Sequence, residues 1–228
     1  MLTNRDREIV RWIGRHGAVQ AQHVMTRFSI GRTACYRRLH ELAEFGLIRR
    51  HRLLYNEAGL LTATPDGLRW ADPHPLTPAR VSLALLPHTL ASAALAALLE
   101  PDLTDQTLLS DREHRAAERA AAQPLASAII GSDRGDHRGL HQPDLVLIGA
   151  AGEPMTAIEI ERTLKTKARL ERILRGYLRN RNLATVRYYA PPQIANAVER
   201  AARATGADAL LELAPLPEAA TPTIWRQR

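Results

Sequence analysis

Cysteine and lysine are almost missing from this chain of 228 residues. Cys35 is the single cysteine, which excludes an internal disulfide bond and a zinc site built from cysteines. We expect it to be a small buried residue. Lys165 and Lys167 are the only lysines, so arginine carries nearly all of the positive charge. Arginine is suited to phosphate contacts, although a GC-rich genome would produce the same bias.

Long apolar runs are also missing. No run reaches the roughly 18 residues that a membrane span requires. Acidic and basic residues follow Asn4, where a secretory signal would carry its apolar core, so we expect a cytoplasmic protein. The chain is 45% hydrophobic, which is enough to bury a core, and its formal net charge is +7. This basic balance favours nucleic acid as the partner, ahead of an anionic membrane surface.

The composition changes along the chain and divides it into four parts. A length of 228 residues allows one large domain or two small ones. We expect a basic domain at 1–72, a proline-rich linker with a connecting helix at 73–105, an alternating helix and strand domain at 106–215, and a poorly ordered tail at 216–228.

The first domain has the periodicity of three helices followed by a hairpin. The helices are expected at residues 4–16, 21–28 and 33–45. In the third of them, Cys35, Leu39 and Leu42 recur at i, i+4 and i+7, so they predict its buried stripe. A β-hairpin is expected between Leu47 and Thr64.

The sequence SIGRTACYRRLHELAEFGLIRR, from Ser29 to Arg50, resembles winged helix-turn-helix domains. A recognition helix must bury one face and offer the other to the major groove of DNA. The residues expected to contact DNA on the free helix face and at the start of the wing are Arg32, Thr33, Tyr36, Arg37, Arg50 and Arg52. Residues 1–72 hold 12 arginines against 7 acidic residues, which fits phosphate binding. The alternative is a winged-helix module used only for protein contacts.

Three carboxylates form a second motif in the later domain. Pro143-Asp144 opens an apolar run, and Glu159 and Glu161 lie in the run Ala-Ile-Glu-Ile-Glu. Side chains alternate along a strand, so Glu159 and Glu161 share a face, and Asp144 can join them if the two runs pair. Clustered carboxylate oxygens suit Mg²⁺ or Mn²⁺. The alternative is that the two glutamates form ion pairs with Arg162 and nearby arginines.

The expected elements of this domain are a helix at 111–122, strands at 125–130, 144–148 and 157–161, a helix at 164–180, a strand at 186–190, a helix at 195–205 and an edge strand at 209–213. This order resembles the PD-(D/E)xK superfamily, the fold of restriction endonucleases. The expected fold class is therefore α+β, a winged helix-turn-helix followed by a restriction-endonuclease-like α/β domain.

The resemblance also implies roles for individual residues. Asp144 matches the PD element and Glu159 the acidic position of (D/E)xK, whereas Glu161 stands where the family has lysine. Asp144 and Glu159 would then hold Mg²⁺ or Mn²⁺, with Glu113 from the first helix as a further ligand. Glu161 or Lys165 would orient or deprotonate the attacking water. The implied catalytic residues are thus Asp144, Glu159, Glu161 and Lys165.

A basic segment follows the carboxylates. Residues 162–187 carry nine basic residues and one acid, Glu171. This excess is too large for a solvated face balanced by ion pairs, so a polyanion or an acidic protein partner is expected. Lys167, Arg169 and Arg172 are the candidate DNA contacts here, and Tyr177 is expected in the core or at its rim.

The whole chain resembles the replication-relaxation family of bacterial plasmids and integrative elements. The motifs are the winged helix, Leu86-Pro-His-Thr-Leu90, Leu109-Ser-Asp-Arg-Glu-His-Arg115, and Gln142-Pro-Asp144 with Ala157-Ile-Glu-Ile-Glu-Arg-Thr-Leu-Lys165. The family implies binding of double-stranded DNA in replication, relaxation or conjugative transfer. Two alternatives are an active Mg²⁺-dependent endonuclease or nickase, and a transcriptional repressor whose second domain only dimerises. A homodimer is expected if the target site is palindromic.

Overall fold

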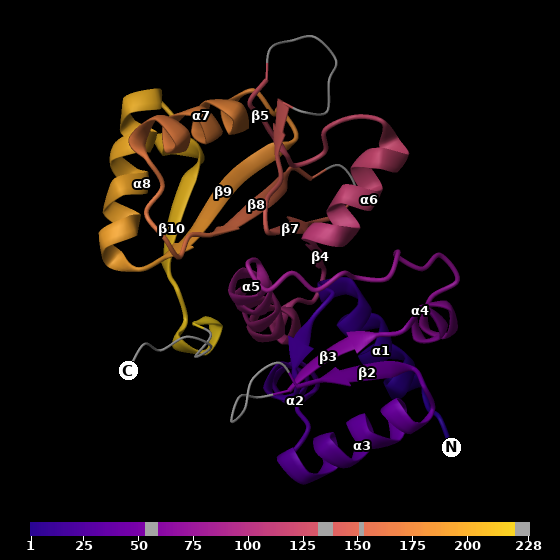
Figure 1. Ribbon diagram of the computed structural model, residues 1–228. Coiled ribbons are helices and arrows are strands. Elements are labelled where there is room, and N and C mark those ends of the chain that lie inside the picture. Colours follow the sequence, from indigo (N-terminus) through magenta and orange to yellow (C-terminus); the bar gives the residue numbers. More distant parts are fainter. Residues whose placement is uncertain (53–58, 132–138, 151–152, 222–228) are drawn as a thin grey trace. The chain divides into compact units, whose positions relative to one another are not determined.

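The computed structural model describes residues 1–52, 59–131, 139–150 and 153–221 (Figure 1). Helices and strands both contribute, which confirms the α+β class. The chain forms two compact units, residues 1–102 together with the chain from Glu218 onward, and residues 103–217. Among the helices that the structure describes, none has the length and apolar character needed to cross a bilayer.

The first unit consists of helices and a small antiparallel sheet. Its elements are α1 (Asn4–His16), β1 (Val19–Gln20), α2 (Ala21–Phe28), α3 (Arg32–Glu44), β2 (Ile48–His51), β3 (Leu60–Ala63), α4 (Pro65–Ala71), α5 (Leu86–Leu99), η1 (Glu100–Asp102) and η4 (Glu218–Ala220). The strand order is β1-β3-β2. The three expected helices and both hairpin strands are confirmed, whereas β1 and α4 were not expected. The hairpin tip at 53–58 lies outside the described residues.

Local capping signals explain where the helices begin and end. Thr3 accepts a hydrogen bond from the backbone of Asp6, and the Asp6 carboxylate accepts one in return from Thr3, which forms a capping box for α1. Gly17 ends α1 with φ 78°, a left-handed conformation that glycine adopts without a Cβ penalty. The buried stripe of α3 is as expected, because Cys35 and Leu42 are fully buried.

The connecting helix packs on this first core. Ala93 and Ala97 of α5 are buried in the same cluster as α1 and α3. Just after α5, the buried Glu100 accepts a hydrogen bond from Trp12 Nε1 at 3.1 Å and pairs with Arg27. Ala220 of η4 is also fully buried. The part of the expected poorly ordered tail that the structure describes is therefore packed, contrary to the expectation.

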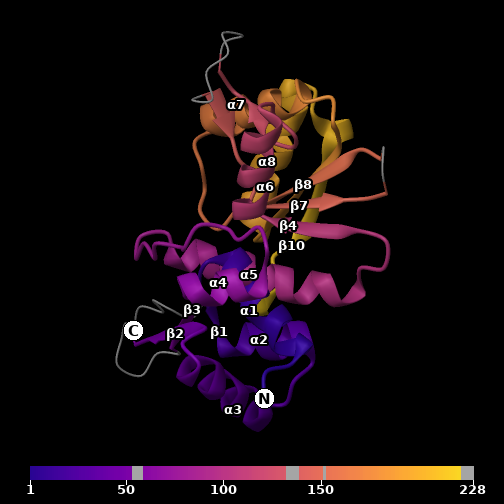
Figure 2. The same cartoon turned by 90° about the vertical axis from the view of Figure 1, so that its right-hand side faces the viewer.

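The second unit is built on a five-stranded sheet. Its elements are β4 (Thr107–Ser110), α6 (Asp111–Ala121), β5 (Ala128–Ile129), β6 (Leu140–His141), β7 (Leu145–Ile148), β8 (Met155–Ile160), α7 (Lys167–Leu178), β9 (Leu183–Ala190), α8 (Pro192–Thr205), η3 (Asp208–Leu210) and β10 (Leu211–Pro215). The strand order is β10-β9-β8-β7-β4, in which β10, β9 and β8 are parallel and β7 and β4 are antiparallel to their neighbours. Figure 2 shows β8, β7 and β4 following one another in this order.

One sequence-based expectation for this sheet is wrong, and one of its strands was not expected. The strand expected at 125–130 does not join it, because only Ala128–Ile129 is a strand and it pairs with β6 in a separate two-stranded sheet. The fifth strand is instead β4, which pairs with β7. The physical reason is that the backbone at 124–127 is bound by side chains, as described below, so it is not available for a ladder.

Hydrophobic packing fixes the position of α7 and α8. Ala157 of β8 lies opposite Val186 of β9, and both are buried in one cluster with residues of α7 and α8. Alternation along β8 places Glu159 on the same face as Ala157. The carboxylate of Glu159 is therefore directed into the layer between the sheet and α7.

Candidate functional site

The pairing of β7 with β8 brings the predicted carboxylates together. Asp144 precedes β7, and its backbone N–H donates to the carbonyl of Ile158 at 3.0 Å. The Asp144 carboxylate accepts the N–H of Ile160 at 2.7 Å. Asp144 is thus fixed beside the end of β8 that carries Glu159 and Glu161.

Glu159 lies in a buried cluster of donors. Its side chain is 4% exposed, and Oε1 accepts hydrogen bonds from the Tyr177 hydroxyl and from His141 Nε2, the latter at 2.8 Å. Burial acts to raise the pKa of Glu159, but the charge and hydrogen bond of His141 hold it below its ordinary value. Burial acts to lower the pKa of His141, whereas the Glu159 carboxylate raises it above the ordinary value. This arrangement favours a Glu159 anion beside a histidinium.

Glu161 follows β8 and is paired with Lys165. The ammonium of Lys165 contacts Glu161 Oε2, and both side chains are largely buried. Burial raises the pKa of Glu161 above its ordinary value, and the neighbouring carboxylates of Glu159 and Asp144 add to this, against the effect of Lys165. The structure thus brings Asp144, Glu159, Glu161 and Lys165 into one cluster, which we call the carboxylate cluster.

The first helix contacts Asp144 through Asp111, whose carboxylate is paired with Arg115 at 2.5 Å. The backbone N–H of Asp111 donates to the carbonyl of Asp144 at 3.1 Å. Burial raises the pKa of Asp111, and Asp144 raises it further. Glu113, the expected metal ligand, instead accepts hydrogen bonds from the backbone N–H and hydroxyl of Ser110 at 2.9 and 3.0 Å, which caps α6.

The carboxylate oxygens are chemically suited to Mg²⁺ or Mn²⁺. Within the described ranges, however, no three histidine, cysteine, aspartate or glutamate side chains are arranged to hold a metal ion. Glu159 and Glu161 are engaged by His141 and Lys165, so an ion would have to displace these contacts. Tyr188 of β9 lies opposite Glu159 of β8 in the sheet. Its buried hydroxyl has no hydrogen-bond partner in the part of the chain described.

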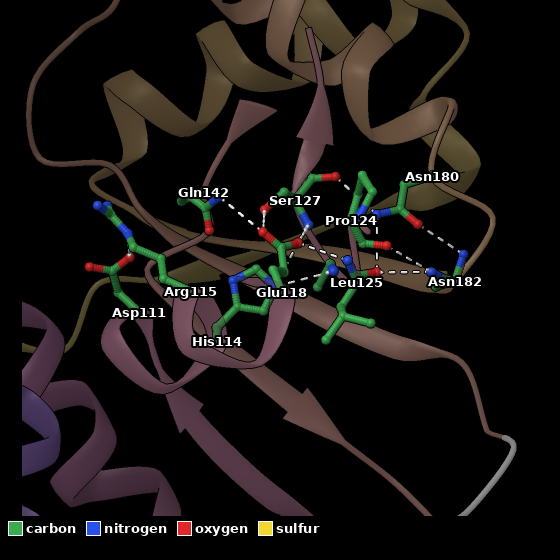
Figure 3. Close-up of polar contacts among 11 residues, drawn as sticks. Asp111, His114, Arg115, Glu118, Pro124, Leu125, Ser127, Gln142, Asn180 and Asn182 are labelled. Atoms are coloured by element: carbon green, nitrogen blue, oxygen red, sulfur yellow. Dashed lines mark hydrogen bonds and ion pairs between the residues drawn. The ribbon is translucent and has the colours of Figure 1, made fainter. Parts of the chain in front are cut away.

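A buried polar network supports the loop that leads to the cluster (Figure 3). Glu118 accepts hydrogen bonds from Leu125 N at 2.8 Å, from the Ser127 N–H and hydroxyl at 3.2 and 2.8 Å, and from Gln142 Nε2 at 3.0 Å. Asn180 Nδ2 donates to the carbonyls of Leu125 and Ser127. These contacts satisfy the backbone at 124–127 without a strand partner.

The network has the residue types of a serine hydrolase but not their arrangement. His114 Nε2 lies 3.2 Å from Glu118 Oε1 and 3.2 Å from the backbone nitrogen of Ala126. Ser127 donates to Glu118 rather than to His114, and all three side chains are buried. A nucleophile must be accessible and bonded to its base, so we assign this network a supporting role.

The exposed face of α3 carries the expected polar residues. Arg32, Thr33 and Arg37 are exposed and Tyr36 is 40% exposed. The Arg32 guanidinium lies 5.9 Å from the centre of the Tyr36 ring. Arg50, on β2, is also exposed.

Several of these side chains border a single concavity. A cavity of about 290 Å³ is lined by the polar residues Gln22, Arg32, Tyr36 and Arg50 over an apolar floor that includes Leu39. Two guanidinium groups at one concavity favour an anion. Arg38 is different, because it is bound to Asp6 and Glu41 and so holds α3 to α1.

The cationic side chains of α7 that were expected to contact DNA are exposed. Lys167, Arg169 and Arg172 are all exposed. The single acid of this segment, Glu171, pairs with Lys167 at 3.7 Å and with Arg175 at 3.0 Å. Arg169 and Arg172 have no ion-pair partner among the described residues, so the exposed surface of α7 keeps a net positive charge.

Comparison with protein-family models, with curated proteins and with solved structures finds no match for this chain.

Proposed function

We propose that the chain is a double-stranded DNA-binding protein whose first unit is a winged helix-turn-helix domain. The observation that carries this proposal is the division of α3 into a buried stripe and an exposed basic face. Arg32, Tyr36 and Arg37 lie on that face, and Arg32 and Tyr36 share a concavity with Arg50. The three helices α1, α2 and α3 and a small antiparallel sheet of order β1-β3-β2 are the elements of such a domain, which also supports the proposal. The hairpin of β2 and β3 would be the wing, with Arg50 and Arg52 at its start.

The motifs in the sequence support a more specific setting. We propose that the protein acts in replication, relaxation or transfer of a plasmid or integrative element, in the cytoplasm. A homodimer would suit a palindromic target. In this proposal α3 reads bases, whereas Arg50 and Arg52 contact phosphates, which are the more frequent partners of exposed arginines.

The proposal is tested by fluorescence anisotropy with duplexes selected from a random-sequence library. Arg37→Ala is expected to weaken binding of the selected duplex about fivefold or more, because a base contact of this kind is typically worth about 1–3 kcal/mol. Arg69→Ala is the matched control, since Arg69 is an exposed arginine of the same unit on α4. Equal affinities for the wild type, Arg37→Ala and Arg32→Ala would contradict the assignment of α3 as the reader.

A second candidate function is metal-dependent phosphodiester cleavage by the second unit, with a PD-(D/E)xK-like fold. The observation in its favour is the convergence of Asp144, Glu159, Glu161 and Lys165 beside the end of β8. A bound divalent ion would supply water activation and charge neutralisation there. Asp144 and Glu159 would hold it, and Lys165 would stabilise negative charge developing on the phosphate.

Plasmid nicking with Mg²⁺ or Mn²⁺ distinguishes this candidate from DNA binding alone. Asp144→Asn is expected to abolish cleavage, whereas Asp208→Asn, a change at an exposed aspartate of η3, is expected to retain it. If the wild type binds its selected duplex and does not cut it with either ion, the nuclease candidate is rejected. A repressor whose second unit only dimerises would then remain.

A further inference from the structure

A groove in the second unit lies next to the carboxylate cluster, and apart from Lys165 its lining has no part in the functions proposed so far. Its volume is about 300 Å³, and it lies between α8 and the chain that leads into α7. The apolar residues that line it are Leu164, Leu170, Ala197, Ala201 and Ala204. Leu164 is 67% exposed, so an apolar side chain forms an open wall of the groove.

The charged residues of the groove are all cations. Lys165, Lys167 and Arg200 complete its lining, and no acidic residue takes part. Lys167 and Arg200 are exposed, whereas the ammonium of Lys165 reaches Glu161. The side chain of Lys165 therefore joins the groove to the carboxylate cluster.

We propose that this groove binds one unpaired nucleotide of a DNA strand. Its base and sugar would lie against the leucine and alanine side chains, and its phosphate would lie between Lys167 and Arg200. The inference rests on the proposed DNA-binding function and specifies the form of DNA that the second unit takes. The first unit would bind duplex, and the second would bind a strand whose bases are not paired.

The chemistry of the lining distinguishes an unpaired nucleotide from a duplex. A duplex keeps its bases stacked and offers mainly phosphates and groove edges to a protein. Phosphates would satisfy the cationic rim but would leave the apolar floor without a partner. An unpaired nucleotide offers an apolar face and an anion together. Single-strand sites combine a cationic groove with side chains against which the bases lie, usually aromatic ones, and in this groove leucine and alanine side chains would take that place.

An acidic peptide with an apolar anchor offers the same two features. The surrounding charge favours nucleic acid, because α7 carries further exposed cations outside the groove. Arg169 and Arg172 are exposed on this helix, and Lys167 stands at its first position. A nucleic acid strand can reach from the groove to these further cations, whereas the short acidic segment of a peptide would fill the groove alone.

The test measures binding of fluorescein-labelled oligothymidylate to the full chain by anisotropy, with the selected duplex measured in parallel. Ala204→Leu fills the groove from an exposed position without changing charge, and Leu164→Ser removes the apolar wall. Both are expected to weaken oligothymidylate binding about fivefold or more and to leave duplex affinity unchanged. Ala120→Leu, at an exposed position of α6, is the matched control and should change neither affinity.

Two outcomes overturn the proposal. One is unchanged oligothymidylate affinity in both groove variants while their melting temperatures match that of the wild type. The other is binding of a labelled acidic leucine-containing peptide that Ala204→Leu weakens, while the affinity for oligothymidylate is the same in the wild type and in this variant. Absence of duplex binding by the wild type would instead refute the reader in the first unit, so the two failures are distinguishable.

Discussion

Glu118 is expected to contribute a large, pH-dependent part of the stability of the second unit. Its carboxylate is buried and accepts hydrogen bonds from Leu125, Ser127 and Gln142. Burial acts to raise the pKa of Glu118, but these bonds and His114 lower it from 4.5 to about 2. A difference of this size corresponds to about 3 kcal/mol of folding free energy.

The sign of the pH dependence follows from the direction of this shift. A carboxylate whose pKa is lowered by folding stabilises the folded state above its unfolded pKa, and this contribution is lost as the pH falls through the folded pKa. The full contribution of Glu118 is therefore expected above pH 4.5, and it should decline between pH 4.5 and about 2. Glu118→Gln keeps the shape of the side chain and removes the charge.

Urea denaturation followed by circular dichroism measures this effect. At pH 7 we expect Glu118→Gln to lower the free energy of unfolding by about 3 kcal/mol, because the contribution of the charged carboxylate is lost. The amide also places its NH₂ group against hydrogen-bond donors, which acts in the same direction. The difference in the free energy of unfolding between the wild type and Glu118→Gln should become smaller as the pH falls below 4.5. Glu199→Gln, which alters a carboxylate of α8 with 44% side-chain exposure, should cost less than about 1 kcal/mol. The reasoning would be refuted if Glu118→Gln lowered the free energy of unfolding as little as this control does, or by an amount that does not change with pH.

Thermal denaturation of two further variants tests one buried contact in each unit. Tyr177→Phe removes a hydrogen-bond donor to the buried Glu159 and should lower the free energy of unfolding by about 1–3 kcal/mol. Its control is Tyr36→Phe, which should change the free energy of unfolding very little because the Tyr36 ring is 40% exposed. Equal melting temperatures for these two variants would show that the buried hydrogen bond is not formed. Gly67→Ala would place a Cβ 1.9 Å from the carbonyl oxygen of Leu47, so this variant should melt far below the wild type. Its control is Gly31→Ala, whose Cβ would meet nothing within 4 Å. Similar melting temperatures for these two variants would contradict the close approach of the backbone at α4.

Local signals in the sequence were sufficient for most of the first unit. The i, i+4, i+7 stripe of Cys35, Leu39 and Leu42 correctly predicted the buried side of α3, because side-chain periodicity and burial are linked within one helix. Strand alternation and the Pro-Asp dipeptide likewise predicted the approach of Asp144 to β8. The prediction for α3 needed no knowledge of contacts between distant parts of the chain, whereas the prediction for Asp144 depended on the pairing of two strands.

The residues that were missed depend on such distant contacts. His141 touches Glu159 only because β6 is a two-residue strand that brings a single side chain to the cluster, and no periodicity marks so short a strand. The binding of segment 124–127 by Glu118 and Asn180 also depends on tertiary structure. Glu113 was different, because the Ser-x-x-Glu pattern of a capping box was present in the sequence and favours the role that Glu113 has.

The path of the chain near its last described residues has a practical consequence. The backbone passes from the first unit to the second between Asp102 and Leu103 and returns between Pro217 and Glu218. A protease that cut only the first passage would release residues 1–102 from the rest of the chain, and the packing of η4 on α5 would then hold the two fragments without a covalent link. A fragment ending at residue 102 would lack Ala220, a buried residue of the first unit, and would expose apolar surface of α5. Expression trials of the isolated first unit should therefore supply residues 218–221 as a separate peptide or through a short engineered linker.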